Sequence, residues 1–271
     1  MSEKIQQTVN HILSIVRTKP DAGIILGSGL GGFSKEILVE HSLSYSEIPN
    51  FPVSTVAGHQ GKLIFGKLSG KNIVVMQGRF HFYEGYTMQE ITFPVRVMKM
   101  LGIKNLFISN AAGGVNPDYK IGDLMFIRDH INLMPSNPLI GKNDESLGTR
   151  FPDMSEPYNR KLISLAEKTA EQKNIRAHTG VYAAVSGPTF ETHAEYKYIR
   201  AIGGDAVGMS TVPEAIVAAH MNLSCFAVSV ITDLGGMDEQ TPVSHLDVLK
   251  AAQEAEGKLT IIIKELLTSL G

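Results

Sequence analysis

Short apolar runs recur along this chain, and they constrain its possible folds more than any other feature. Seven such runs lie at residues 23–26, 62–65, 72–76, 105–109, 124–127, 181–185 and 226–231. Several are rich in Val and Ile and do not alternate with polar residues, which is typical of strands buried on both faces. Helical segments lie between or after many of them, so we expect an α/β fold with a mainly parallel sheet under helices.

The helices are predicted from apolar periodicity and from capping residues. One helix is expected over residues 3–17, and others over 88–101 and 160–173. Three further helix starts fit the pattern of a capping box, in which Ser or Thr is followed three residues later by an acidic residue. They are Thr192 with Glu195, Thr211 with Glu214, and Ser244 with Asp247. Residues 132–157 show no such pattern and contain four prolines, so we expect a long irregular loop with a functional or partner-binding role.

The composition is that of an ordinary globular protein. The 271 residues are 43% hydrophobic and 19% charged, which fits one domain spanning residues 1–271. A net charge of -2 without a basic run gives no reason to expect nucleic acid or an anionic membrane as a partner. Because the N-terminus is polar, no signal peptide is expected, and because no apolar window is long enough, no membrane span is expected either. Cys225 is the single cysteine and is expected to be a buried, inert thiol. Together these features predict a cytoplasmic protein.

The glycine-rich segment GSGLGG, residues 27–32, has two interpretations. The spacing of Gly27, Gly29 and Gly32 matches a dinucleotide-binding fingerprint, which would indicate an oxidoreductase with a nicotinamide or flavin cofactor. The alternative is a loop that holds a bare phosphate group. The fingerprint needs an acidic residue at the end of a second strand about 20 residues on, but Glu47 lies in a loop-like segment. The dinucleotide interpretation also leaves the other polar clusters of the chain unexplained.

Six polar clusters follow the ends of predicted strands. In chain order they are GSGLGG, QGRFHFYEGY, NAAGGVN, SGPTFET, GMST and TDLGG. The carboxyl ends of parallel strands meet at one edge, which is where open α/β sheets bind ligands. We therefore expect these clusters to converge.

The side chains in these clusters indicate what kind of ligand they would bind. Arg79, His81, Ser28 and Ser210, with the N–H groups of glycine-rich turns, make a donor-rich pocket suited to a dianion. Tyr83 and Met209 suit the face of a sugar, and Phe190 with Glu191 suits a flat heterocycle that offers an N–H. None of the histidines is paired at the spacing of a zinc-binding helix, so a metal is not expected.

At this point the chain resembles a known family, the trimeric, low-molecular-mass purine nucleoside phosphorylases. The resemblance runs from about residue 20 to the C-terminus and rests on the clusters above together with further motifs: HQGK, TFPVRVMKMLG, GDLMFIRDHIN, NPLIG, RFPDMS, GVYAAVSGPTFET and GDAVGMSTVPE. It implies a single α/β domain around a mixed, mostly parallel sheet that curls into a distorted barrel. It also implies phosphorolysis of purine ribo- and deoxyribonucleosides to the free base and (deoxy)ribose 1-phosphate, a pentosyl transfer that needs phosphate as co-substrate but no cofactor or metal.

The resemblance also implies roles for individual residues. The phosphate site would be Ser28, His59, Arg79, His81, the backbone N–H of Ala111, and Ser210. The ribose would contact Tyr83, Met209 and His245, and the base would contact Phe190, Glu191, Val207, Gly208 and Asp233. His81, Glu191 and Asp233 would be the catalytic residues, with Glu84 behind His81. Phe151, in the long loop, would close the site of a neighbouring subunit in a homotrimer.

Asp233, in SVITDL, departs from the family pattern, because members specific for 6-oxopurines usually carry asparagine there. An ionised carboxylate only accepts hydrogen bonds, so it would repel O6 and favour a 6-amino group, whereas a protonated one could donate to N7. Glu191 favours 6-oxopurines. We therefore expect inosine and guanosine as substrates with adenosine possible, and an adenosine-preferring or methylthioadenosine phosphorylase as the alternatives. A non-catalytic purine-binding protein is a further alternative.

Overall fold

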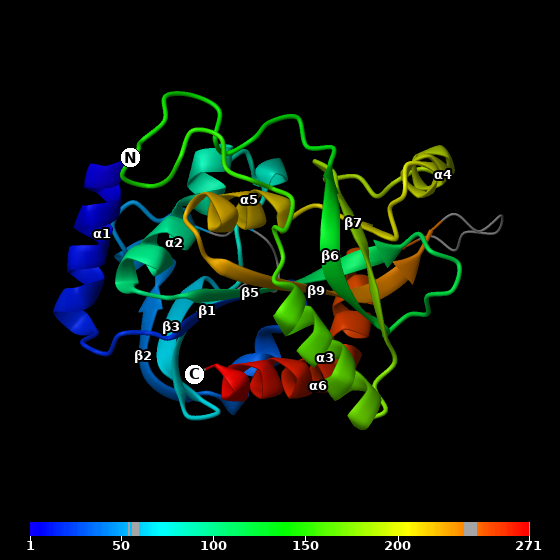
Figure 1. Ribbon diagram of the computed structural model, residues 1–271, viewed down its shortest axis with the longest axis horizontal. Coiled ribbons are helices and arrows are strands. Elements are labelled where there is room, and N and C mark those ends of the chain that lie inside the picture. Colours follow the sequence, from blue (N-terminus) through cyan, green and yellow to red (C-terminus); the bar gives the residue numbers. More distant parts are fainter. Residues whose placement is uncertain (54, 56–59, 236–242, 271) are drawn as a thin grey trace.

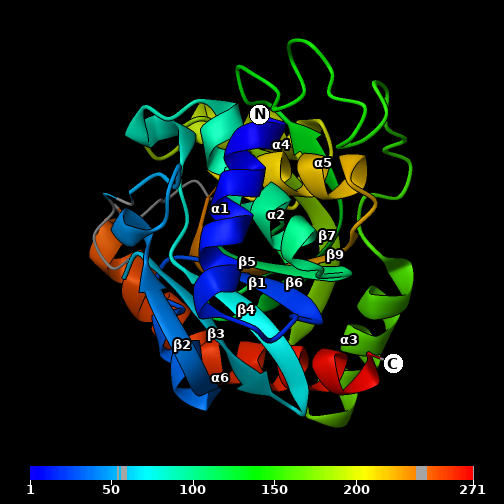
Figure 2. The same cartoon turned by 90° about the vertical axis from the view of Figure 1, so that its left-hand side faces the viewer.

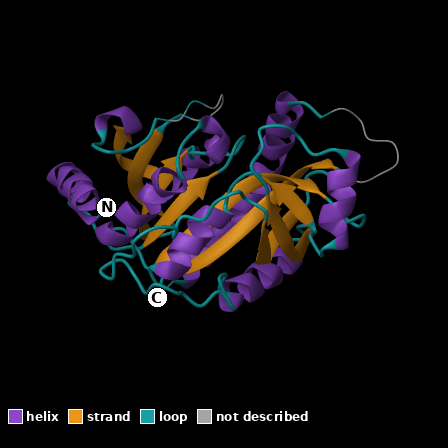
Figure 3. Cartoon of the chain, turned by 90° about the horizontal axis from the view of Figure 1, so that it is seen from above, coloured by secondary structure: helices purple, strands orange, loops and turns teal. Residues whose placement is uncertain are grey.

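The computed structural model describes residues 1–53, 55, 60–235 and 243–270 of the chain (Figure 1). Within these residues the strands form one mixed sheet with helices on both faces, as Figure 3 shows in a view from above. The strands are β1 Ala22–Leu26, β2 Leu38–Ser44, β3 Lys62–Leu68, β4 Lys71–Gln77, β5 Asn105–Gly114, β6 Leu124–Asn132, β7 Ala177–Ala184, β8 Ala206–Gly208 and β9 Ser224–Leu234.

The strand order is β2-β3-β4-β1-β5-β8-β7-β6-β9, and β9 also pairs with β5. The last five strands of this order therefore close into a ring, while β2, β3, β4 and β1 extend from it as an open sheet. Parallel pairs join β1 to β4 and β5, β5 to β9, and β7 to β6 and β8. The remaining pairs are antiparallel. The expectation of a mixed, mostly parallel sheet that curls into a distorted barrel is confirmed.

The helices lie in two layers. Helices α1 (Ser2–Ile15), α2 (Met88–Leu101) and α5 (Val212–His220) cover one face of the sheet, and α3 (Arg160–Gln172) and α6 (His245–Ser269) cover the other (Figures 1 and 2). Helix α4 (His193–Ala201) follows β7. Short 3-10 turns occupy Gly31–Glu36, Tyr45–Glu47 and Phe82–Glu84. No helix in the described part of the chain is long and apolar enough to cross a membrane.

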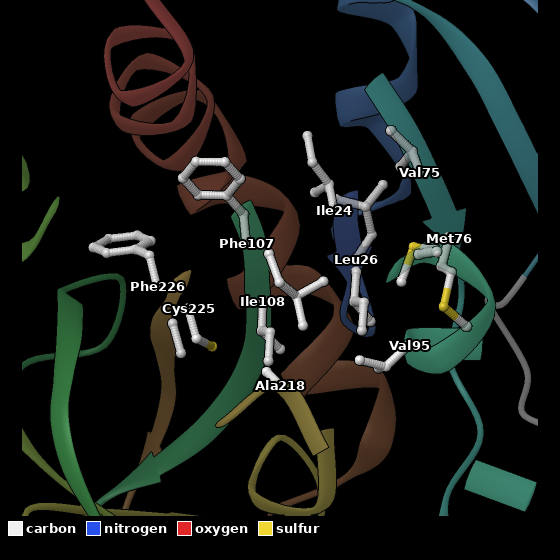
Figure 4. Close-up of a cluster of buried hydrophobic side chains, with 14 of the residues drawn as sticks. Ile24, Leu26, Val75, Met76, Val95, Phe107, Ile108, Ala218, Cys225 and Phe226 are labelled. Carbon is white, nitrogen blue, oxygen red and sulfur yellow. The ribbon is translucent and has the colours of Figure 1, made fainter. Parts of the chain in front are cut away.

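The core lies between these layers. Every residue of β1 is buried, which confirms that its uninterrupted apolar run belongs to a strand covered on both faces. Figure 4 shows Ile24 and Leu26 of β1 beside strands β4 and β5, with Val95 of α2 and Ala218 of α5 packed against the sheet. Cys225 is buried in the same core, and burial raises the pKa of its thiol.

Most element positions agree with the sequence analysis, and the differences concern strand ends and one edge. β5 continues through Gly114 and β9 through Leu234, so two clusters expected in loops lie on strands. Both extensions exist because β5 and β9 pair along their whole length, from Asn105–Ser224 to Gly114–Leu234. Strand β2 was not predicted; its residues are mostly exposed, so it carries no apolar run. Residues 133–159 contain no helix or strand, as expected of the long loop.

Candidate functional site

One cavity collects residues from all six polar clusters. Its lining comes from the loops after β1, β4 and β7, from the strands β5, β8 and β9, and from the first turn of α6. The residues that line it are Gly27, Ser28, Arg79, His81, Tyr83, Asn110, Ala111, Ala112, Gly113, Phe190, Glu191, Val207, Gly208, Met209, Ser210, Thr232, Asp233, His245 and Val248. Every site residue named from the sequence is in this set except three. Glu84 contacts His81 but does not line the cavity. His59 lies outside the described residues, and Phe151 lies elsewhere, in the loop between β6 and α3.

Arg79 is held at the bottom of this cavity by contacts on its inner side. Its side chain is 2% exposed, and Nη2 donates to the carbonyl of Ser109. Its Nη1 lies 3.2 Å from Oγ1 of Thr211 and 3.4 Å from Oε1 of Glu214. A buried guanidinium is costly without a counter-charge, and Glu214, itself buried, supplies one. Arg79 is thereby fixed where it also lines the cavity.

This arrangement overturns the expected capping box of Thr211 and Glu214. Thr211 is the N-cap residue of α5, but its φ is 73° and its side chain caps no backbone N–H. Its hydroxyl instead accepts a hydrogen bond from Nδ2 of Asn110 at 2.8 Å and one from Arg79. Leaving the buried charge of Arg79 without a counter-charge would cost about 3–5 kcal/mol, which is more than the roughly 1 kcal/mol that a helix cap contributes, so the contacts with Arg79 prevail over the cap. The capping boxes of Thr192 and Ser244 are confirmed.

The remaining donors surround Arg79. Oγ of Ser210 lies 3.1 Å from the same Thr211 hydroxyl that Arg79 contacts, so the serine and the guanidinium are neighbours. Ser28 and Ala111 line the cavity with them. Helix α5 begins just after Ser210, and a helix N-terminus adds partial positive charge. These groups form a cup, which we call the anion cup, defined by Ser28, Arg79, His81, Ala111 and Ser210.

Asn110 belongs to this region and was missed as a site residue. It is buried, and its Oδ1 has no hydrogen-bond partner among the described residues. The sequence placed Asn110 in a polar cluster, NAAGGVN, but for a residue expected in a loop the direction of the side chain could not be predicted. Asn110 lies on β5, and the hydrogen bond from its side chain to Thr211 shows that the side chain points toward the anion cup.

His81 is oriented by Glu84, as the sequence suggested. Nδ1 of His81 lies 3.0 Å from Oε1 of Glu84, and the backbone N–H of His81 donates to the same oxygen at 2.8 Å. Burial lowers the pKa of His81, although Glu84 acts in the opposite direction. Burial by itself would raise the pKa of Glu84, but hydrogen bonds from His81 and Thr55 outweigh it and bring the pKa to about 2. Tyr83 stacks on His81, with ring centroids 4.7 Å apart.

Two carboxyl groups lie at the other end of the cavity. Oε1 of Glu191 is buried without a hydrogen-bond partner among the described residues, and burial raises the pKa of this side chain. Oδ1 of Asp233 accepts a hydrogen bond from the Thr232 hydroxyl at 2.9 Å, and Oδ2 accepts one from the Tyr196 hydroxyl at 3.3 Å. Burial also raises the pKa of Asp233, and these two hydrogen bonds oppose that rise. Phe190 is 41% exposed at the mouth of this end.

Strand β5 runs from the anion cup to the carboxyl end of the cavity, so it gives the distance between them. Asn110 meets Thr211 at the anion cup, while a Cβ on Gly113 would lie 2.8 Å from Oδ2 of Asp233. Three residues of extended chain span roughly 10 Å, so the anion cup and the carboxyl end are about that far apart. Tyr83, Met209 and His245 complete the lining of the same cavity.

Comparison with known proteins gives the family. The model of the phosphorylase superfamily matches residues 21–268. Purine nucleoside phosphorylase 1 of Geobacillus stearothermophilus is 48% identical over 266 residues, which are 98% of this chain and 97% of that protein. This chain belongs to the purine nucleoside phosphorylases. The Bos taurus purine nucleoside phosphorylase is 47% identical over 277 residues, covering 99% of this chain and 95% of its own length.

Solved structures of the family have the same fold. Schistosoma mansoni purine nucleoside phosphorylase in complex with adenosine has a TM-score of 0.94 and 41% identity, covering 99% of this chain and 98% of that one. The complex of the same enzyme with inosine has a TM-score of 0.94 and 40% identity. These matches support the phosphorylase interpretation of the glycine-rich loop rather than the oxidoreductase one.

Among the described residues, no group of three or more His, Cys, Asp and Glu side chains is arranged to hold a metal ion. The expectation that the reaction needs neither metal nor cofactor stays a prediction.

Proposed function

We propose that this protein cleaves purine nucleosides with inorganic phosphate, giving the free base and ribose 1-phosphate or deoxyribose 1-phosphate. One observation carries the proposal: a single cavity holds the buried Arg79 at one end and, at the other, the buried Asp233 and the partly buried Glu191. A phosphate dianion needs the first, and a purine that offers N–H groups needs the second. The span of roughly 10 Å between them leaves room for a sugar.

The relatives support this assignment. Solved Schistosoma family structures contain adenosine, inosine or guanosine, and the Schistosoma mansoni isoform 2 structure contains cytosine and ribose-1-phosphate. The last of these is the product expected when phosphate takes the place of the base.

In the proposed reaction the glycosidic bond loosens first, and C1′ of the sugar gains positive charge. Phosphate in the anion cup stabilises that charge and then attacks C1′. Arg79 and the hydroxyls of Ser28 and Ser210 fix the dianion, so little reorganisation is needed as charge develops. Because Arg79 is already held by Glu214 and Thr211, it does not have to be ordered when phosphate binds.

His81 has a defined part in phosphate binding. Its Nδ1 faces Glu84, whose low pKa keeps it an acceptor, so the neutral ring carries its proton on Nδ1. The remaining nitrogen, Nε2, then accepts a hydrogen bond from a protonated phosphate oxygen. Glu84 acts by holding this tautomer, and Tyr83 braces the ring by stacking on it.

The carboxyl end stabilises the departing base. Glu191 accepts the N1–H of a 6-oxopurine with the oxygen that lacks a partner among the described residues. Asp233 lies beside the purine and reads position 6 or N7, as acceptor when ionised and as donor when protonated. Inosine and guanosine are the proposed main substrates, with adenosine also cleaved. His245 lines the cavity where a 5′-hydroxyl would lie, which favours ribosyl substrates over 5′-methylthio ones.

We further propose a homotrimer in which Phe151 completes a neighbour's site. Phe151 is 84% exposed, and the Arg150 guanidinium lies 5.6 Å from its ring centroid. An aromatic side chain so exposed on a long ordered loop suits an interface, where large apolar side chains gain most from burial. Phosphate is the proposed co-substrate, with no cofactor and no metal.

A substrate panel tests the function. Inosine, guanosine, adenosine and 5′-methylthioadenosine are each incubated with the purified protein, with and without phosphate, and release of the base is followed. We expect phosphate-dependent release from inosine and guanosine and slower release from adenosine. Strong preference for the methylthio substrate would move the protein to the alternative class. Binding of purine without turnover of any substrate would leave a non-catalytic binding protein.

A further inference from the structure

Tyr196 is a buried residue that neither the motifs nor the proposed mechanism uses. It lies on α4, is 0% exposed, and packs with Val115, Ile199 and Val207. It does not line the substrate cavity, yet its hydroxyl donates to Oδ2 of Asp233, which does. The two residues come from different elements, α4 and β9.

Two glycines make room for this contact. A Cβ on Gly113 would lie 2.8 Å from Oδ2 of Asp233 and 3.2 Å from the Tyr196 hydroxyl. A Cβ on Gly235 would lie 2.1 Å from Cε1 of the Tyr196 ring, which no real side chain tolerates. The backbone next to Asp233 on the neighbouring strand β5, and the backbone two residues after Asp233, therefore leave space for the tyrosine, so the hydrogen bond is part of how this end of the cavity is built.

The contact determines what Asp233 offers to a purine. Thr232 donates to one carboxyl oxygen and Tyr196 to the other. Donors on both oxygens stabilise the ionised form against burial. The ionisable groups around the Tyr196 hydroxyl are Asp233 on β9 and Glu191 in the segment before α4. The Tyr196 hydroxyl also hydrogen-bonds to the Glu191 side chain, and the charge of Asp233 adds to the burial that raises the pKa of Glu191.

We propose that Tyr196 is a specificity-determining positioning residue, which holds Asp233 as a hydrogen-bond acceptor and thereby gives the site its activity on 6-aminopurine nucleosides. The inference rests on the proposed phosphorolysis and adds a residue that acts on the base through Asp233. An accepting Asp233 takes a hydrogen bond from the 6-amino group of adenosine. Without the tyrosine hydroxyl, Asp233 binds a proton more readily and becomes a donor to N7 or O6, which suits inosine.

The test compares the wild type with Tyr196→Phe, which keeps the ring and removes only the hydroxyl. The measured quantity is the ratio of kcat/KM for adenosine to kcat/KM for inosine at saturating phosphate, between pH 5.5 and 8.5. Loss of one hydrogen bond to a charged group is expected to lower this ratio about tenfold at those pH values where Asp233 is protonated in the variant but ionised in the wild type. It also moves the pH at which the ratio falls upward by about one unit. An unchanged ratio and pH profile would overturn the proposal.

A double-mutant cycle separates this role from a structural one. In an Asp233→Asn background there is no carboxylate to hold, so adding Tyr196→Phe should leave the ratio within about twofold. An equal change in both backgrounds, or an equal fall in kcat/KM for both nucleosides, would overturn the proposal. Tyr158→Phe is the matched control, because it removes another buried tyrosine hydroxyl, one paired with His130 and outside the cavity lining.

Failure of the inference about Tyr196 can be told apart from failure of the proposed function. If the wild type releases no base from any nucleoside in the presence of phosphate, the function itself is wrong. If the wild type is active and only the Tyr196 comparison fails, the function stands and the inference about Tyr196 is wrong. Thermal unfolding of each variant confirms that the assays compare folded proteins.

Discussion

Oε1 of Glu214 lies 3.4 Å from Nη1 of Arg79, and both side chains are almost completely buried. These residues are 135 positions apart in the chain, and they meet only because β4 and α5 converge at the cavity. The pair neutralises the arginine from the inside, at the position where Arg79 forms part of the anion cup. We therefore expect that removing Glu214 changes how the stability of the protein responds to phosphate.

Glu214→Gln should make the stability of the protein depend strongly on phosphate. Removing one partner of a buried ion pair costs about 3–5 kcal/mol, because the other charge stays buried and uncompensated. Phosphate in the anion cup supplies the missing negative charge, so adding it should restore part of the loss. Denaturant unfolding in phosphate and in chloride at equal ionic strength measures the effect.

Asp123→Asn is the control for this experiment. Asp123 is also buried, and it pairs with Arg176 and His178 at 2.9 Å each, outside the cavity lining. Its variant should be destabilised equally in phosphate and in chloride. If Glu214→Gln responds to phosphate no more than the wild type does, Arg79 is not part of a phosphate site.

Glu84→Gln should remove part of the acid sensitivity of the protein. Hydrogen bonds from His81 and Thr55 lower the pKa of Glu84 from 4.5 to about 2 in the folded state. The stabilisation from this shift is present above pH 4.5 and is lost as the pH falls toward 2, because the unfolded chain then binds the proton first. It amounts to at most about 3 kcal/mol.

The difference in unfolding free energy between the wild type and Glu84→Gln is therefore expected to be largest near neutral pH. It should narrow steadily as the pH is lowered from 5 to 3 in denaturant titrations. A difference that stays constant over this range would show that Glu84 has an ordinary pKa.

Asp233→Asn should raise the ratio of kcat/KM for inosine to that for adenosine. An amide donates to O6 and interacts with N7, whereas the carboxylate accepts only. Replacing a repelled pair by a hydrogen-bonded one is worth roughly tenfold or more in this ratio. Initial rates for both nucleosides at saturating phosphate give the measurement. No change in the ratio would mean that Asp233 does not read position 6 of the base.

Phe151→Ala and Glu191→Gln should complement each other if the proposed trimer is correct. Each variant is expected to lose at least tenfold in kcat/KM for inosine, because one loses the aromatic cover and the other the N1–H acceptor. In mixed trimers made by co-refolding, some sites take Glu191 from one subunit and Phe151 from its neighbour. The mixture should therefore be more active than either variant alone. Activity equal to the average of the two would show that each site is built from one chain.

Local signals in the sequence located the elements well. The apolar runs placed every strand except β2 and the short β8, and the capping boxes of Thr192 and Ser244 marked two helix starts correctly. Such signals are short-range, because strand periodicity and helix caps depend on residues within a few positions of each other. β2 was not predicted because an exposed edge strand needs no apolar pattern.

The sequence by itself determined the alternation of strands and helices, the positions of the polar clusters after the strands, and, through its motifs, the family. The tertiary structure alone decided where these clusters point and what each side chain contacts. It turned Glu214 from a helix-capping residue into the counter-ion of Arg79, and it brought Tyr196 to Asp233. The physical reason is that burial and charge pairing act between residues far apart in the chain, and in the interior they outweigh the local preferences that a sequence displays.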